Sequence, residues 1–275
     1  MAGFGSAYLS NLVLSYLFGG TGFTPPATYY LALLTGLGVA GGGQAEVSGN
    51  GYARLAVANN TTNFPAATGG IVKNAVDWDW GAPTGSGWGS GIAGVGIYDA
   101  AAGGNLYAVL AFTPSARSGP AGVHFVVPAN SALITLGYAN PSTSIATYAA
   151  NLVLSRLFGG TSFTAPATWY VALHTTMPTT AGGGVEPSGN GYARLAVANN
   201  TANFPAATGQ QSSEAIAYDF GSPTGSGWGT IVGAAYWDAP TGGNLWFFGP
   251  FTTPRTAAAA IDFSLPAGAG VLTEV

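Results

Sequence analysis

The chain has 275 residues, no cysteine, and six basic against ten acidic residues, which gives a net charge of −4. Charged residues are 6% of the chain, whereas roughly 25% is typical of soluble proteins. These values exclude disulfides, thiolate metal sites and the basic surface that binds nucleic acid. A surface with so little charge indicates a protein that packs against other subunits.

The sequence is one domain written twice. Residues 48–69 read SGNGYARLAVANNTTNFPAATG, and residues 188–209 repeat this string with a single substitution. The repeat predicts two domains of similar fold, residues 1–138 and 139–275, joined by a short polar connection. A function common to both domains must use residues that both copies contain.

Each copy is expected to begin with a short amphipathic helix. Apolar residues recur there at helical spacing: Leu9, Leu12, Val13, Tyr16 and Leu17 in the first copy, and Ile145, Leu152, Val153 and Leu157 in the second. The pairs Gly19-Gly20 and Gly159-Gly160 end the predicted helices, because glycine readily adopts the left-handed conformation of a C-terminal cap. The longest apolar run in this region, Leu12–Phe18, is too short to cross a bilayer, so no membrane partner is expected.

Short strands follow each predicted helix. Residues 26–35 and 166–175 combine β-branched and aromatic residues behind a proline, as the start of a strand does. Asn50-Gly51 and Asn190-Gly191 are tight-turn dipeptides that lead into a further strand. Similar patterns predict these additional strands in the first copy: Ala75–Trp80, Val95–Tyr98, Leu106–Phe112, Val123–Val127 and Ala132–Leu136.

The predicted fold is mostly β. Seven or eight short strands per copy, with turn signals about every ten residues, favour two tandem antiparallel β-sandwich domains of jelly-roll type. A small barrel is the alternative that the pattern leaves open.

The histidines do not form a repeated site. His174 aligns with Leu34, and His124 falls near Asp262, so neither is shared by the two copies. A duplicated histidine nucleophile or metal site is therefore excluded, and each histidine is expected on the surface of a strand or loop. We expect no cofactor, no metal and no enzymatic activity.

A few charged residues do recur, and they are the candidate structural or interface residues: Arg54 and Arg194, Glu46 and Glu186, Asp79 and Asp219. Each arginine is expected to pair with the glutamate or the aspartate of its copy, within the subunit or between subunits. Asp99 is expected to shape the glycine loop that ends at Asn105.

One tryptophan is retained in both copies, as Trp88 and Trp228 within PTGSGWG. Most other aromatic positions exchange one ring type for another, which is typical of packing and not of stacking on a ligand. Trp88 and Trp228 are therefore expected to anchor this loop, with an exposed recognition loop as the alternative.

The order of the motifs in both copies points to a family. PATYYLAL, EVSGNGYAR, FPAAT, GWG and YDA with GGNL follow one another in the first copy, with matching pieces in the second. This order resembles a family of small tailed-phage virion proteins, described as head decoration proteins or as tail or capsid fibre proteins. The resemblance implies a component of the virion.

The favoured hypothesis is a cement or decoration protein that binds the outside of the assembled phage head and stabilises it. Its partner would be the major capsid protein, and the chain would form a homotrimer that is assembled in the host cytoplasm and located on the outer capsid surface. A tail or neck fibre component that binds host receptors is the alternative within the virion. A carbohydrate-binding module is the alternative from another class.

Overall fold

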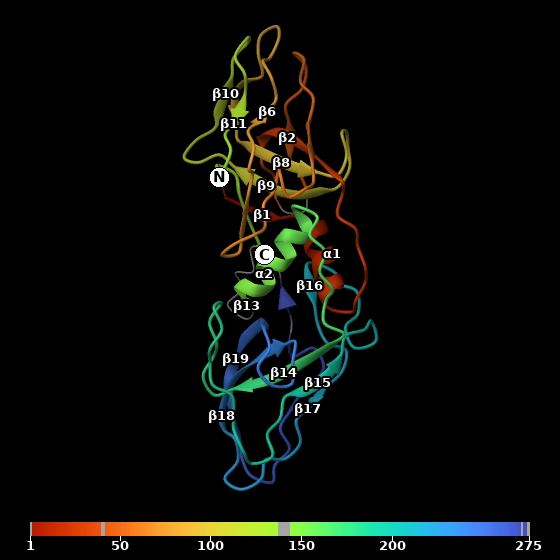
Figure 1. Ribbon diagram of the computed structural model, residues 1–275, viewed down its shortest axis with the longest axis vertical. Helices are drawn as coiled ribbons and strands as arrows, with labels where there is room; N and C mark the ends of the chain where they lie inside the picture. Colours follow the sequence, from red (N-terminus) through yellow and green to blue (C-terminus); the bar gives the residue numbers. More distant parts are fainter. Residues whose placement is uncertain (1, 40–41, 137–143, 271, 274–275) are drawn as a thin grey trace. The chain divides into compact units, whose positions relative to one another are not determined.

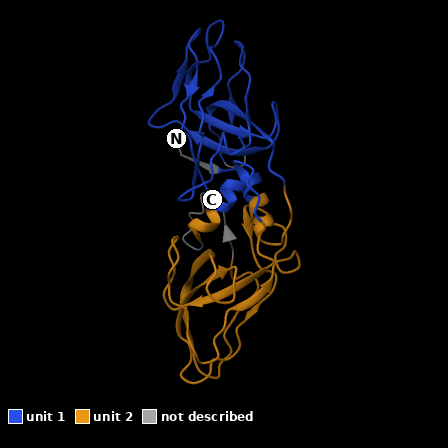
Figure 2. Cartoon of the chain, viewed as in Figure 1, with its two compact units in different colours: residues 1–10, 24–137, 151–163 blue, residues 11–23, 138–150, 164–275 orange. Residues whose placement is uncertain are grey.

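The computed structural model describes residues 2–39, 42–136, 144–270 and 272–273. The chain forms two compact units (Figure 2). Unit 1 contains residues 1–10, 24–137 and 151–163, and unit 2 contains residues 11–23, 138–150 and 164–275. The predicted domain boundary at 138/139 and most of the connection around it lie outside the described residues.

Unit 1 is built on one large sheet with the strand order β3-β2-β8-β9-β1-β12-β5, and β4 also pairs with β2 (Figure 1). Two small two-stranded sheets, β7–β10 and β6–β11, complete its strands. The strands of unit 1 are β1 (Ala2–Gly5), β2 (Thr28–Gly36), β3 (Ala45–Glu46), β4 (Leu55–Ala58), β5 (Ile71–Lys73), β6 (Trp78–Asp79), β7 (Gly89–Ile92), β8 (Gly94–Tyr98), β9 (Leu106–Ala111), β10 (Arg117–Gly119), β11 (Val126–Val127) and β12 (Leu133–Thr135).

Unit 2 repeats this plan in a five-stranded sheet with the order β13-β19-β18-β14-β15. The pairs β16–β21 and β17–β20 match β5–β12 and β6–β11 of unit 1. The strands of unit 2 are β13 (Ser144–Ile145), β14 (Thr168–His174), β15 (Leu195–Ala198), β16 (Gln211–Ser212), β17 (Tyr218–Asp219), β18 (Gly229–Trp237), β19 (Leu245–Ala257), β20 (Ser264–Leu265) and β21 (Leu272–Thr273).

Each copy has its predicted helix, α1 (Ala7–Leu17) and α2 (Thr147–Leu157). The Ser6 hydroxyl caps α1 by accepting a hydrogen bond from the Leu9 amide at 3.1 Å. Gly19 ends α1 with a φ of +102°. A side chain there would also place its Cβ 2.6 Å from the carbonyl oxygen of Phe204, so only glycine fits.

The two copies exchange the ends of their helices. The second half of α1 belongs to unit 2, and the second half of α2 belongs to unit 1. Within unit 2, the Phe18 ring lies 5.0–5.5 Å from four rings, those of Trp169, Phe204, Tyr236 and Phe247. The Asn199 side chain accepts from the Gly19 amide at 2.7 Å and donates to the Leu17 carbonyl at 2.8 Å. The core of unit 2 is thus completed by a segment of the first copy.

Unit 1 is completed in the same way by Phe158. This side chain is buried, and its ring lies 5.2 Å from Tyr29 and 5.6 Å from Phe64. The Asn59 side chain accepts from the Gly159 amide at 2.6 Å, in the role that Asn199 has in unit 2.

The predicted fold class is confirmed: the chain is mostly β, with two β-sandwich domains built mainly from antiparallel strands. In each copy a short strand, β1 or β13, precedes the predicted helix, and β1 pairs with β12 in parallel. β2, β8, β9 and β12 lie where the sequence predicts them, and Asn50 and Gly51 both have the positive φ of the predicted turn. The sequence pattern did not predict β1, β3, β5, β7 or β10. The jelly-roll form of the sandwich stays a prediction.

Candidate functional site

The repeated arginine of unit 1 pairs with Glu46 and not with Asp79. Arg54 Nη2 lies 2.7 Å from Glu46 Oε2, and Arg54 Nε lies 3.0 Å from Oε1, so the contact is bidentate. β2 brings the two residues together, because Glu46 on β3 pairs with Leu34, and Leu55, which follows Arg54, pairs with Leu31. Tyr52 donates to the same carboxylate at 2.9 Å, and its oxygen accepts from the Leu33 amide. Burial raises the pKa of Tyr52, which keeps the phenol in its donating form.

Arg54 also holds the glycine loop that follows β8. Its Nη1 donates to the carbonyls of Ala100 and Gly103, both at 2.8 Å. Its guanidinium carbon lies 3.8 Å from the centroid of the Tyr98 ring, in a cation–π contact. Asp99 closes the loop by accepting from the backbone amide of Asn105 at 2.6 Å. A side chain that is 7% exposed thus joins three segments of the chain.

Unit 2 contains the same arrangement. Arg194 pairs with Glu186 at 2.7 Å, donates to the carbonyls of Ala239 and Gly242, and lies 4.2 Å from the centroid of the Trp237 ring. We call both sets the arginine cluster: Glu46, Tyr52, Arg54, Tyr98 and residues 99–105 in unit 1, and Glu186, Tyr192, Arg194, Trp237 and residues 238–244 in unit 2. Because each guanidinium group hydrogen-bonds to residues of its own unit, the cluster fixes the glycine loop to the neighbouring strands.

Asp79 and Asp219 lie apart from the arginine cluster. Each carboxylate accepts a hydrogen bond from the backbone amide two residues later in the chain, from Gly81 at 2.7 Å and from Gly221 at 2.8 Å. The Gly81 amide, and then His124 with its Nδ1 2.8 Å from the carboxylate, hold the pKa of Asp79 below its usual value. The predicted pairing of an arginine with this aspartate is absent from the described residues.

Trp88 and Trp228 are buried and anchor their loops. Their exposed fractions are 6% and 5%, so neither ring is available to stack on a ligand from solvent. The indole nitrogens donate to the carbonyls of Asn50 and Asn190 at 3.2 and 3.0 Å. The tight turn before YARLAVA is thereby tied to the PTGSGWG loop in each unit.

The two histidines differ in their environment. His124 is exposed, as predicted. The expectation of a surface position was wrong for His174, which is fully buried at the end of β14 with its ring 6.4 Å from the centroid of Trp237. Burial lowers the pKa of His174, and the ring occupies a core position that Leu34 fills in unit 1.

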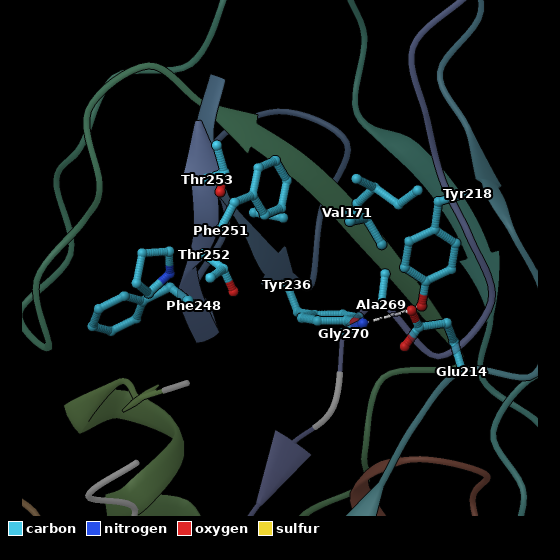
Figure 3. A pocket seen from close by; sticks show the side chains of 14 residues that line it. Val171, Glu214, Tyr218, Tyr236, Phe248, Phe251, Thr252, Thr253, Ala269 and Gly270 are labelled. Carbon is cyan, nitrogen blue, oxygen red and sulfur yellow. Dashed lines mark hydrogen bonds between the residues drawn. The ribbon is translucent and has the colours of Figure 1, made fainter. Parts of the chain in front are cut away.

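The described residues of unit 2 also enclose a cavity of about 430 Å³ between β14, β18, β19 and the segments around Glu214 and Gly270 (Figure 3). Phe251 contributes to its apolar side, and Thr252 lies at the exposed rim. The Phe248 ring packs against Ala235 and Leu245 on the other face of the sheet. The size lies within the range of small-molecule sites.

Polar groups gather at one end of this cavity. The Gly270 amide donates to Glu214 Oε1 at 2.7 Å, and the hydroxyls of Tyr218 and Tyr236 lie 3.2 Å apart (Figure 3). Glu214 is 2% exposed, and its Oε2 has no hydrogen-bond partner in the described part of the chain. Burial raises the pKa of Glu214, although backbone hydrogen bonds partly oppose this effect. A carboxyl group in this setting can accept hydrogen bonds from a ligand.

A family model described as podophage GP4 fiber I protein gp80 matches residues 5–135 and, a second time, residues 144–273. The chain belongs to this family. A comparison with curated proteins finds no match. As a member of the podophage fibre family, the chain is a structural protein of the phage virion, and the resemblance seen in its motifs is confirmed.

Within this fibre-family chain, the sequence pattern found the arginine cluster and missed the cavity. Glu214, Tyr218 and Tyr236 are absent from the first copy, where the corresponding residues are Asn74, Trp78 and Ile97. A search limited to shared residues removes them. The signal that could have found them is that residues 210–217 depart from the repeat and carry an acidic residue there.

Other groups offer little for metal or membrane chemistry. In the part of the fibre-family chain that the structure describes, no three or more His, Cys, Asp or Glu side chains are grouped to hold a metal ion. In the same part, neither helix is long and apolar enough to cross a bilayer.

Proposed function

We propose that the chain is a fibre subunit of a podophage particle, located at its tail or neck, where it contributes to contact with the host. The match of the fibre family to both copies supports this proposal. The arginine cluster and the tryptophan anchors fit it, because they stiffen the loops of each unit against mechanical load. Such a subunit acts by binding and has no enzymatic activity.

Immunogold labelling of purified particles with antibodies to the full chain tests the location. We expect gold at the tail or neck, and particle reconstruction should place density of the two β-sandwiches there. Gold spread over the head surface would contradict the fibre assignment. Release of reducing ends from host surface polysaccharide by the isolated chain would contradict the non-enzymatic assignment.

A capsid cement or decoration protein is the second candidate. The charged fraction of 6% favours it, since a neutral surface can be buried over a large area on the outer capsid at little desolvation cost. The partner would be the major capsid protein, and stabilisation would follow from binding to the assembled head alone. In that case, particles that lack the chain should lose their DNA at lower temperature while adsorption to cells is unchanged.

Either location is served by a homotrimer. Three chains would place six similar β-sandwich units around one axis, so each contact would be repeated and the effective affinity raised. A closed ring also avoids open-ended association of edge strands. Mass photometry of the isolated chain should then show a species of three times 27.4 kDa. A single species of 27.4 kDa, together with isolated copies on the particle, would contradict the trimer.

A further inference from the structure

The cavity of unit 2 lies where unit 1 has a filled core. Four apolar positions of unit 1 are fully buried, and the matching residues of unit 2 are all smaller and line the cavity. The pairs are Leu31 and Val171, Trp78 and Tyr218, Val95 and Ala234, and Leu110 and Gly249. Strand register supports the equivalence, since Val95 pairs with Leu110 and Ala234 pairs with Gly249. At these four positions unit 2 has the smaller side chain, whereas Tyr236 is larger than Ile97, its counterpart in unit 1.

The acidic group in the cavity has a different neighbourhood from its counterpart. In unit 1, the Asn74 oxygen accepts from the Ala132 amide at 2.9 Å, and the Asn74 nitrogen donates to two carbonyls. In unit 2, Glu214 Oε1 makes the equivalent contact with the Gly270 amide. The additional oxygen, Oε2, is buried and unpartnered within the described residues, and such a group is costly unless a donor reaches it.

A glycine lies directly beside this polar end. A Cβ at position 270 would lie 3.1 Å from Glu214 Oε2 and 3.1 Å from the Tyr236 hydroxyl. Unit 1 has Ala132 at the corresponding position, fully buried. Glycine therefore avoids the crowding that a side chain would cause beside the Glu214 oxygen and the Tyr236 hydroxyl.

We propose that the cavity of unit 2 binds one uncharged sugar ring, with ring hydroxyls donating to Glu214 Oε2 and exchanging hydrogen bonds with Tyr218 and Tyr236. The apolar face of Phe251 covers the C–H surface of the ring. The cavity volume of about 430 Å³ suits one ring, and the exposed rim at Thr252 and Thr253 lets the next unit of a glycan extend into solvent.

Charge argues against two other classes of ligand. The cavity-lining residues include no lysine, arginine or histidine, so phosphates and acidic sugars have no counter-charge. A sugar hydroxyl can hydrogen-bond with the carboxyl group in either protonation state.

Saturation-transfer NMR on the full chain tests the proposal with methyl glycosides of glucose, galactose, mannose and N-acetylglucosamine, and with tetramethylammonium as the cationic probe. Two variants address the cavity. Gly249→Leu restores the side chain that unit 1 holds at Leu110, and Glu214→Gln removes the carboxylate. Asp262→Asn is the matched control, because it removes an exposed carboxylate of unit 2 outside the cavity.

We expect at least one glycoside to bind the wild-type chain in the millimolar range. Gly249→Leu should abolish the signal without lowering the melting temperature, and Glu214→Gln should weaken binding about tenfold, the value of one hydrogen bond. Asp262→Asn should bind as the wild type does.

Three outcomes would overturn the proposal: no glycoside binds, glycoside binding is unchanged in both cavity variants, or tetramethylammonium binds while the glycosides do not. The measurement uses the isolated chain. Its result is therefore independent of where the chain sits on the particle.

Discussion

Phe18 should stabilise the unit that the second copy forms, although it belongs to the first copy. The side chain is fully buried in unit 2 and is surrounded by the rings of Trp169, Phe204, Tyr236 and Phe247. Phe18→Ala removes a ring from among four others that are held by strands on several sides. The cavity cannot collapse easily, so we expect the cost at the upper part of the range of about 3–5 kcal/mol for such truncations.

The size of this loss makes it easy to measure. For a unit of this size, about 4 kcal/mol corresponds to a decrease of roughly 8–16 °C in the melting temperature. Hydrogen exchange by mass spectrometry then locates the damage. We expect β14, β18 and β19 to lose protection, while β2 and β8 of unit 1 keep theirs.

Phe158→Ala is the matched control, because Phe158 has the same role in unit 1 and contacts Tyr29 and Phe64. It should lower protection in β2 and leave β14 unchanged. If each substitution instead weakened the unit built from its own copy, the exchange of helix ends would be refuted.

Three further predictions concern polar groups. Arg54→Ala should lower the free energy of unfolding by about 2–3 kcal/mol in denaturant titrations, less than for a fully buried pair because Glu46 stays partly hydrated. Arg54→Lys should recover less than half of this loss. A loss below about 0.5 kcal/mol for Arg54→Ala would mean that the arginine cluster is dispensable for stability. His174→Leu should remove the loss of stability that the wild type shows below about pH 6.5. Burial lowers the pKa of His174 in the folded chain, so the unfolded chain binds the proton more tightly. Melting temperatures of the variant that follow those of the wild type from pH 5 to 8 would contradict this. Glu214→Gln should gain stability relative to wild type as the pH rises above 4.5, the ordinary pKa of a glutamate. Burial raises the pKa of Glu214 in the folded chain, so deprotonation favours the unfolded chain of the wild type. A constant difference between the two pH profiles would show that Glu214 titrates normally.

Features that depend on local chemistry could be predicted from the sequence. Gly19 ends its helix because the backbone there needs a positive φ, and Asn50-Gly51 turns the chain for the same reason. β2 follows from a run of apolar and β-branched residues that is buried along most of its length. These signals are contained within a few neighbouring residues.

Features that depend on strand register or long-range packing could not be predicted from the sequence. Whether Arg54 meets Glu46 or Asp79 is decided by the pairing of β3 with β2, which composition does not encode. Short strands such as β3 carry too few residues to show a period. His174 is buried because β14 ends within the core, where its ring stacks on Trp237.

The exchange of helix ends could not be predicted, because both copies have the same apolar pattern at the end of the helix. The stripe that ends in Leu17 and Phe18 is repeated in Leu157 and Phe158, so either helix end would fit either core by composition alone.

This near-equivalence has a consequence for how the copies could diverge. Because each core is completed by the other copy's phenylalanine, the helix ends and the asparagines that cap them, Asn59 and Asn199, are constrained together. Positions inside a single core carry no such shared constraint. The differences between the units include those at Leu110 and Gly249 and around Glu214, where unit 2 has a cavity.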